Sequence, residues 1–246
     1  MSRKTIENAW SMLIKFGLKE NLEKLIMGQL YMKNLKYYNE LENISSNEYV
    51  GDKYDGHIVI QNSEISLYKI DSNELITKIE TPILSLDLGY LQSPIFCMFM
   101  FDFRNCVKKD FEGNKLITEY QFSEYQREKL RNFGDYALII KNGKEFITRI
   151  KNAFLTNNYN FSSGFVQYYN SNNVEQMRQI NEKNSQIAFW KRDKYSYQQE
   201  YRILVYDSVE DFLSIDIGNI SDITSLIKTD ELLNIGFKIT YNIEQV

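Results

Sequence analysis

Residues 189–204 have the sequence FWKRDKYSYQQEYRIL, in which aromatic and polar residues lead directly into a strongly apolar strand. Glu200 and Arg202 stand at the entrance to that strand. Because side chains alternate between the two faces of a strand, residues that are two apart point to the same face. We therefore expect a carboxylate beside a guanidinium at the rim of a sheet, where the cation keeps the carboxylate ionised. The alternative is an exposed Glu-Arg pair on a strand edge, which contributes little to stability.

The rest of the chain predicts an α+β fold with a mixed, mostly antiparallel central sheet and flanking helices. Helices are expected where apolar residues recur at helical spacing or where Glu, Lys, Arg and Leu predominate: residues 19–27, 123–133, 143–152 and 174–185. Strands are expected at apolar runs: residues 10–16, 94–103 and 136–140, with a meander of three strands at 57–60, 65–70 and 75–79. No Pro-rich or Gly/Ser-rich linker divides the chain, so we expect a single domain over residues 1–246.

Composition excludes several kinds of site. The chain has 1 histidine and 2 cysteines, too few for a three-histidine or four-cysteine zinc site, and we expect no metal centre. Cys97 lies in an apolar run and is expected to be a buried small hydrophobe, because no local motif joins it to His57 as a nucleophile and base. The net charge of −4 argues against non-specific binding to duplex nucleic acid.

The absence of targeting segments and of common catalytic motifs excludes further classes of protein. No apolar run reaches the length of a membrane span, and residues 1–7 lack the apolar region of a signal peptide, which predicts a soluble, cytoplasmic protein without membrane contact. There is no P-loop, dinucleotide-binding glycine motif or G-x-S-x-G elbow. Gly51–Gly56 forms a glycine-flanked turn with Asp52 and Asp55, without the spacing of an EF-hand loop. Aspartates in such turns are usually solvated, and we expect the same here.

A resemblance adds to this interpretation. The motif Y-x-x-E-Y-R at Tyr197–Arg202, which runs into a strand, resembles a signature of many uncharacterised bacterial and phage proteins. Such proteins also begin with three consecutive elements: a short strand with a lysine in it, then a helix, then a second strand. Here residues 13–16, 19–27 and 28–32 correspond to them. An acidic turn often follows, for which residues 51–56 are the match. The resemblance covers residues 10–56 and 187–206.

This arrangement is in turn similar to that of ADP-ribosyltransferases. In that superfamily the first strand supplies a basic residue, the second an aromatic or hydroxyl residue, and a late strand begins with the catalytic Glu. The resemblance implies that Lys15 or Phe16 takes the first role, Tyr31 the second and Glu200 the third. It also implies NAD as a substrate, with Arg202 or Lys15 holding a phosphate and Trp190 and Tyr197 forming an aromatic wall for a base. The chain departs from a common pattern because Gln198 stands where a second Glu is frequent.

Three functional hypotheses follow. The first is an NAD-dependent ADP-ribosyltransferase-like protein of phage or bacterial conflict systems that modifies a host or phage protein or nucleic acid. The second is a non-catalytic binding or inhibitor protein that reuses the same scaffold. The third is a magnesium-dependent nuclease that uses scattered carboxylates. The sequence does not determine the oligomeric state.

Overall fold

Strand β5 (Pro94–Met100) lies at the centre of the fold because it pairs with three other strands. In the computed structural model, which describes residues 12–44, 50–101, 106, 108–182 and 184–242, β5 is buried along nearly its whole length. Its sequence PIFCMFM is apolar on both faces, as expected of a strand that is covered on both sides. One edge of β5 pairs with β12 (Glu200–Val205), and the other edge is shared by β1 (Leu13–Gly17) and β2 (Gln29–Asn34).

The remaining elements complete the chain. The other strands are β3 (His57–Tyr68), β4 (Leu75–Asp87), β6 (Lys108–Glu112), β7 (Lys115–Tyr120), β8 (Tyr136–Ile140), β9 (Phe161–Phe165), β10 (Gln167–Tyr169), β11 (Trp190–Arg192), β13 (Phe212–Asp216), β14 (Thr224–Lys228) and β15 (Phe237–Asn242). The α-helices are α2 (Lys19–Ile26), α3 (Leu35–Ile44), α4 (Glu124–Leu130), α5 (Gly143–Thr156), α6 (Val174–Glu182) and α7 (Thr229–Ile235). Short 3₁₀ helices are η2 (Arg131–Phe133), η3 (Asn184–Phe189), η4 (Asp193–Gln198) and η5 (Ser221–Ile223).

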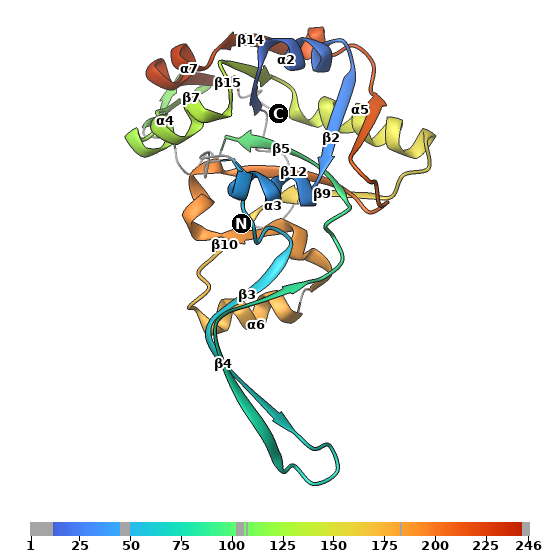
Figure 1. Cartoon of the computed structure of the whole chain (residues 1–246). Helices are drawn as coiled ribbons and strands as arrows, with labels where there is room; N and C mark the ends of the chain where they lie inside the picture. The colour runs from blue at the N-terminus through green and yellow to red at the C-terminus, as the bar shows by residue number, and fades with distance from the viewer. Residues whose placement is uncertain (1–11, 45–49, 102–105, 107, 183, 243–246) are drawn as a thin grey trace.

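Eight strands form the central sheet, and all of their pairings are antiparallel. The order is β13-β2-β5-β1-β8-β14, with β12 and then β9 added to the other edge of β5. Helices α2 and α5 pack on one face through a cluster that includes Leu22 and Phe146, and α4 and α7 pack on the other through Leu130 and Leu232 (Figure 1). The structure confirms the expected α+β class with mostly antiparallel strands. The expectation of a mixed central sheet is wrong, because the one parallel pairing among the described residues, β10 with β11, belongs to a separate sheet.

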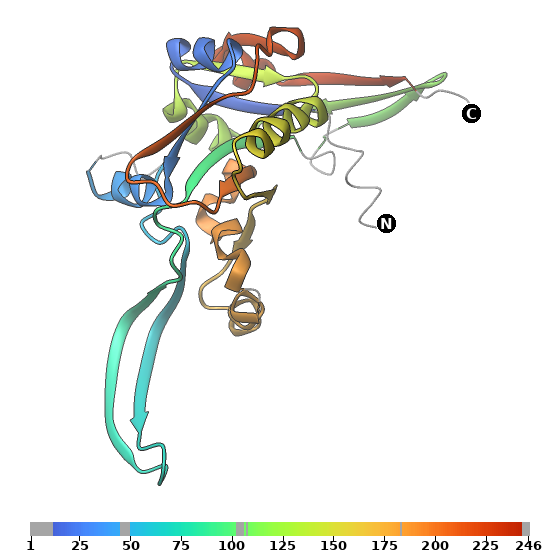
Figure 2. The ribbon, with the colours of Figure 1, turned by 90° about the vertical axis from the view of Figure 1, so that its right-hand side faces the viewer.

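Strands β3 and β4 form a long two-stranded ribbon that projects away from the rest of the molecule in both ribbon views (Figures 1 and 2). Here the expected three-strand meander is wrong. Cross-strand pairing of β3 with β4 runs from His57–Asp87 to Tyr68–Leu75, so that β3 continues without a break where two separate strands were expected. The chain reverses after β3, at residues 69–74, where Asn73 has a positive φ of 54°.

Most other helix and strand boundaries agree with those expected from the sequence. The expected helix over 123–133 is α4 followed by η2, and Ser123 begins it with a capping box to Gln126. The expected strand over 94–103 ends at Met100. Parts of three expected elements lie outside the described residues: residues 102–103 of this strand, Trp10 and Ser11 of the first expected strand, and residue 183 of the expected helix over 174–185.

Gly134, just before β8, permits a close approach between this segment and Gly17 at the end of β1. Its φ of +140° and ψ of 163° fall in a region essentially restricted to glycine. A Cβ atom here would lie 2.3 Å from the carbonyl carbon of Gly17, so both strain and a backbone clash oppose any side chain.

We expect Gly134→Ala to lower the free energy of unfolding by about 2–5 kcal/mol, because strain and overpacking add. Gly113→Ala is the matched control: its φ is also positive, at +59°, but no heavy atom lies within 4 Å of the added Cβ, so about 1 kcal/mol of strain is expected. Urea unfolding of both variants measures the difference. Equal losses would contradict the role of the Gly17 contact.

Candidate functional site

Arg202 is the centre of a buried ionic cluster. Its guanidinium is fully buried and donates two parallel hydrogen bonds to Asp55, Nη1 to Oδ1 and Nη2 to Oδ2, each at 2.8 Å. Nη2 also donates to Glu200 Oε2 at 3.0 Å, and Nη1 donates to the Ala188 carbonyl. The expectation that Glu200 and Arg202 share a face is confirmed. The alternative of an exposed pair on a strand edge is wrong, because β12 lies between β5 and β9.

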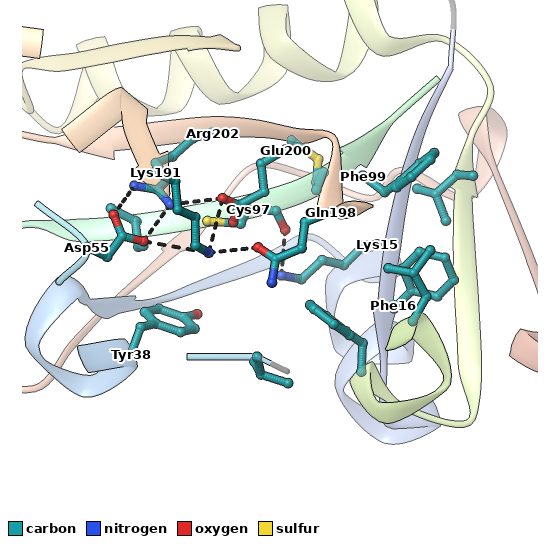
Figure 3. A pocket seen from close by; sticks show the side chains of 16 residues that line it. Lys15, Phe16, Tyr38, Asp55, Cys97, Phe99, Lys191, Gln198, Glu200 and Arg202 are labelled. Carbon is teal, nitrogen blue, oxygen red and sulfur yellow. Dashed lines mark hydrogen bonds and ion pairs between the residues drawn. The ribbon is translucent and has the colours of Figure 1, made fainter. Parts of the chain in front are cut away.

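Lys191 completes the cluster from β11, the strand that precedes β12 in the chain. Its Nζ donates to Gln198 Oε1 at 2.7 Å and lies 3.4 Å from Glu200 Oε2 and 3.8 Å from Asp55 Oδ2. The side chains of Lys191 and Asp55 are almost fully buried, and that of Glu200 is 10% exposed. Two carboxylates therefore face two cations in an environment where an unpaired charge would be costly (Figure 3).

The turn before β12 aims these side chains inward. Gln199 adopts the left-handed conformation, with φ 40° and ψ 53°, which is uncommon for a residue other than glycine. It ends helix η4, and its carbonyl accepts a hydrogen bond from the Met100 amide at 2.8 Å. The amide of Glu200 donates to the Tyr168 hydroxyl at 2.9 Å. The turn thus lets Gln198 and Glu200 approach Lys191 together.

The acidic turn, Gly51–Gly56, packs against this region instead of facing solvent. Asp52 and Asp55 are 1% and 2% exposed, so the expectation that they are solvated is wrong. The reason is pairing with arginines from distant sequence: Asp55 binds Arg202, and Asp52 binds Arg192, whose Nε lies 3.1 Å from Oδ1. Glu42 of α3 also reaches Arg192, at 3.3 Å. Carboxylates that bind guanidinium groups in this way can be buried at tolerable cost.

The cluster keeps Glu200 ionised. Burial alone would raise the pKa of Glu200, but the nearby charges of Lys191 and Arg202 outweigh burial and lower its pKa to about 2. Burial has the opposite outcome at Cys97, whose pKa rises to about 12, so this residue is a thiol at neutral pH and not a nucleophilic thiolate. Glu200 is therefore an anion held in place and able to accept hydrogen bonds.

Lys15 reaches the same region through a gap in the sheet. β1 pairs with β5 at Phe99 and Met100, and β2 pairs with β5 at Pro94 and Ile95, which leaves the edge at residues 96–98 between them. Lys15 Nζ donates to the Cys97 carbonyl at 2.7 Å in this gap and lies 4.5 Å from the centre of the Phe96 ring. Burial lowers the pKa of Lys15, and Glu200 partly offsets that effect.

Two adjoining hollows surround this gap. The inner cavity, of about 70 Å³, is lined by Lys15, Tyr38, Lys191, Glu200 and Arg202 among others. The groove, of about 720 Å³, lies outside it and is lined from β1, α2, β2 and α3. Five residues line both hollows: Lys15, Phe16, Tyr38, Val50 and Phe133. The groove is therefore large enough for a nucleotide-sized molecule, whereas the inner cavity accepts only a small group such as a hydroxyl.

The structure brings some of the expected site residues together and separates others. Lys15 and Glu200 line the inner cavity, as does Arg202. Lys15 and Tyr31 line the groove, but Tyr31 does not reach the inner cavity. Tyr31 is 44% exposed and stacks on Phe212 with ring centres 4.9 Å apart.

The two expected aromatic wall residues lie elsewhere. Trp190 is buried in a hydrophobic cluster beside Tyr169 and lines neither hollow. Tyr197 is buried next to Tyr125, on the far side of Gln199, and lines a separate surface depression of about 560 Å³ with Tyr120. Tyr197 belongs to the 3₁₀ helix η4 and Trp190 to the separate strand β11, so neither lies on an extended strand continuous with Glu200.

Sequence reasoning missed several residues of the inner cavity. Asp55, Lys191, Gln198 and Tyr38 were not assigned to the site, although each lines the inner cavity. The signal for Asp55 was the pair of aspartates in a glycine-flanked turn within a chain whose late segment contains Arg192 and Arg202. Nothing in the local sequence distinguishes Lys191 or Tyr38 from the other lysines and tyrosines of the chain.

Comparison with protein-family models, with curated proteins and with solved structures found no match. None of the helices in the described ranges is long and apolar enough to cross a membrane. Within the same ranges, no group of three or more His, Cys, Asp or Glu side chains is arranged to hold a metal ion. The site must therefore be interpreted from its own geometry.

We expect Asp55→Asn to lower the free energy of unfolding by about 3–5 kcal/mol, because it leaves the buried Arg202 charge without its bidentate partner. Glu74→Gln is the control, since the Lys69–Glu74 pair at the ribbon tip is more than half exposed and should cost less than about 1 kcal/mol. Chemical unfolding at neutral pH measures both. Similar small losses would show that the Asp55–Arg202 pair does not organise the site.

Glu200 should also give the protein a distinct acid response. Its folded-state pKa, about 2, lies below the ordinary value of 4.5, so its charge stabilises the fold above pH 4.5 and this stabilisation is lost as the pH falls toward 2. Between those pH values, wild type should lose up to about 3 kcal/mol more stability than Glu200→Gln. Urea unfolding at a series of pH values tests this, and parallel curves for the two proteins would refute it.

Proposed function

We propose that the protein is an NAD-consuming ADP-ribosyltransferase-like enzyme whose dinucleotide binds in the groove and whose Glu200 acts from the inner cavity. The observation that carries the proposal is the shared wall at Lys15 and Tyr38, which joins an open, nucleotide-sized groove to a buried, ionised carboxylate. The acceptor would be a protein or nucleic acid.

The groove walls have the chemistry that a dinucleotide requires. Tyr31 and Tyr37 present exposed rings, and Tyr31 already stacks with Phe212, so a base has aromatic faces to pack against. Lys33 reaches into the same space and is held by Asp211, while Lys24 lies on the facing helix. With Lys15 at the inner end, three ammonium groups line the groove and can bind phosphate oxygens.

The charge balance at the inner end of the groove also favours a dinucleotide. Asp55 and Glu200 are matched by Arg202 and Lys191, so that among the described residues Lys15 has no ion-pair partner of its own. An anionic group in the outer groove would supply the missing negative charge. We assign to Lys15 the phosphate nearest the reacting ribose.

The chemistry then follows from the position of Glu200. The bond between the ribose C1′ and the nicotinamide nitrogen breaks, and its electron pair leaves with nicotinamide. Positive charge develops on the ribose, and the Glu200 carboxylate stabilises it while accepting a hydrogen bond from the 2′-hydroxyl, a group small enough for the inner cavity. A nucleophilic oxygen or nitrogen of the acceptor forms the new bond to C1′ and loses its proton to solvent or a basic group.

A second candidate is a non-catalytic binding or inhibitor protein on the same scaffold. It is favoured by the closure of the cluster, because Glu200 is only 10% exposed and its Oε2 already accepts from both Arg202 and Lys191. In that case the groove would bind its ligand without turnover. Titration calorimetry that detects NAD binding, together with no release of nicotinamide, would favour this candidate.

The direct test measures nicotinamide release from NAD by chromatography. We expect release by wild type and a loss of at least about 100-fold in kcat for Glu200→Gln, the magnitude for removal of a group that stabilises transition-state charge. Tyr31→Ala should instead raise KM for NAD by about 10-fold or more, because one stacking face is lost.

Two controls make the assay decisive. Glu74→Gln, at the ribbon tip, should leave release unchanged, and circular dichroism should show that Glu200→Gln remains folded. The transferase proposal fails if wild type releases no nicotinamide above the protein-free blank at high enzyme concentration, or if a folded Glu200→Gln protein matches wild type.

A further inference from the structure

Within the part of the chain that the structure describes, the β3–β4 ribbon has no packing partner along most of its length. Ile58 and Val59 are buried at its base, where Ile58 packs with Ile180 and Trp190. Away from its base the ribbon projects alone (Figure 2), and six of its apolar side chains are 37–55% exposed: Ile65, Leu67, Tyr68, Leu75, Ile76 and Ile79. A two-stranded hairpin by itself is marginal in water, and three or more strands are normally needed for stability. The ribbon therefore lacks the cover that its length and composition require.

The two edges of the ribbon differ in how they are protected. β4 carries Lys78 and Pro82, and the register shift at Leu67 and Tyr68 leaves Ile76 as an extra residue on β4. Lysine, proline and bulges are the devices that block pairing at an exposed strand edge. The 12 residues of β3, HIVIQNSEISLY, contain no lysine and no proline. The open edge is thus the edge of β3.

We propose that the β3 edge pairs with the β3 edge of a second copy of this chain, in antiparallel orientation about a two-fold axis. The product is a continuous four-stranded sheet in the order β4-β3-β3-β4, with the blocked β4 strands outside. A second copy fits this edge because it presents the same unprotected strand, and the four strands meet the number that an independent sheet needs. The contact is isologous and closes at a dimer.

Charge restricts the register of this pairing. A two-fold axis perpendicular to the sheet passes through one residue position, which then faces itself across the interface. Glu64 is the only acidic residue of β3, and centring on it would oppose two carboxylates. Centres on either side of Glu64 avoid that repulsion, and a centre on Ile65, Ser66 or Leu67 also brings the exposed apolar side chains of Ile65 and Leu67 into the paired segment. With Ser66 at the centre, Ile65 faces Leu67 of the second copy, and the strand contributes apolar pairs on one face.

The test compares two substitutions within one cross-strand pair. Ile65 and Ile79 are directly opposite each other on the same face of the ribbon, but Ile65 is on β3 and Ile79 on β4. For the full-length protein at about 100 µM, well above a micromolar Kd, light scattering should give a dimer mass for wild type and for Ile79→Lys. Ile65→Lys should be monomeric, because it places a lysine at the paired edge in any of the three registers.

Several results would overturn the proposal. A monomeric wild type at this concentration excludes the dimer. Loss of the dimer in both variants shows that a face of the ribbon, not the β3 edge, makes the contact. A dimer that survives Ile65→Lys shows that a different surface of the protein makes the contact. Far-UV circular dichroism and a melting temperature close to that of wild type establish that the Ile65→Lys protein remains folded. We expect it to fold because the Ile65 side chain is 37% exposed in the native chain.

Discussion

The buried guanidinium of Arg202 is the constraint on which the site depends. A fully buried arginine is tolerated only when its charge is paired, and here Asp55, Glu200 and the Ala188 carbonyl accept hydrogen bonds from its two terminal nitrogens, whereas Nε has no hydrogen-bond partner among the described residues. Those partners come from the acidic turn, from β12 itself and from η3. One side chain thereby fixes three segments that are separated by up to 147 positions in the sequence. The acidic turn is held in place by this pairing and by the second pair, Asp52 with Arg192.

The same cluster gives Glu200 its chemical character. Burial would otherwise favour the neutral acid, and only the two nearby cations keep the carboxylate ionised. Replacement of such a network by apolar residues is often neutral or stabilising, so stability alone does not explain why it is present. A buried anion that touches a small cavity behind an open groove is more readily understood as a prepared binding site. The split of β1 and β2 along β5 creates that groove and brings Lys15 to its inner end.

Much of the sheet could be predicted from the sequence, and the site only in part. The alternation of side chains along a strand was enough to place Glu200 beside Arg202, and apolar runs located β5, β8 and β12. The burial of Asp52 and Asp55 could not be predicted, because it depends on arginines more than 130 positions away that a local pattern does not reveal. Trp190 and Tyr197 were expected near Glu200 because the resemblance implied an aromatic wall there. Trp190 lies instead on β11 and Tyr197 in the 3₁₀ helix η4, and their rings pack in two other hydrophobic clusters. The ribbon was misjudged because the polar residues at 61–63 interrupt the apolar pattern, whereas pairing with β4 keeps the strand continuous there.

The central claim is that the groove and the Glu200 cavity form one nucleotide site joined at Lys15 and Tyr38. Hydrogen–deuterium exchange with and without saturating NAD tests it most directly, because amide protection reports binding whether or not turnover occurs. The account predicts slower exchange in peptides that cover β1, β2 and α3 and in the peptide that begins β12, with no change in the distal ribbon. Unchanged exchange in all four of those segments at millimolar NAD would contradict it.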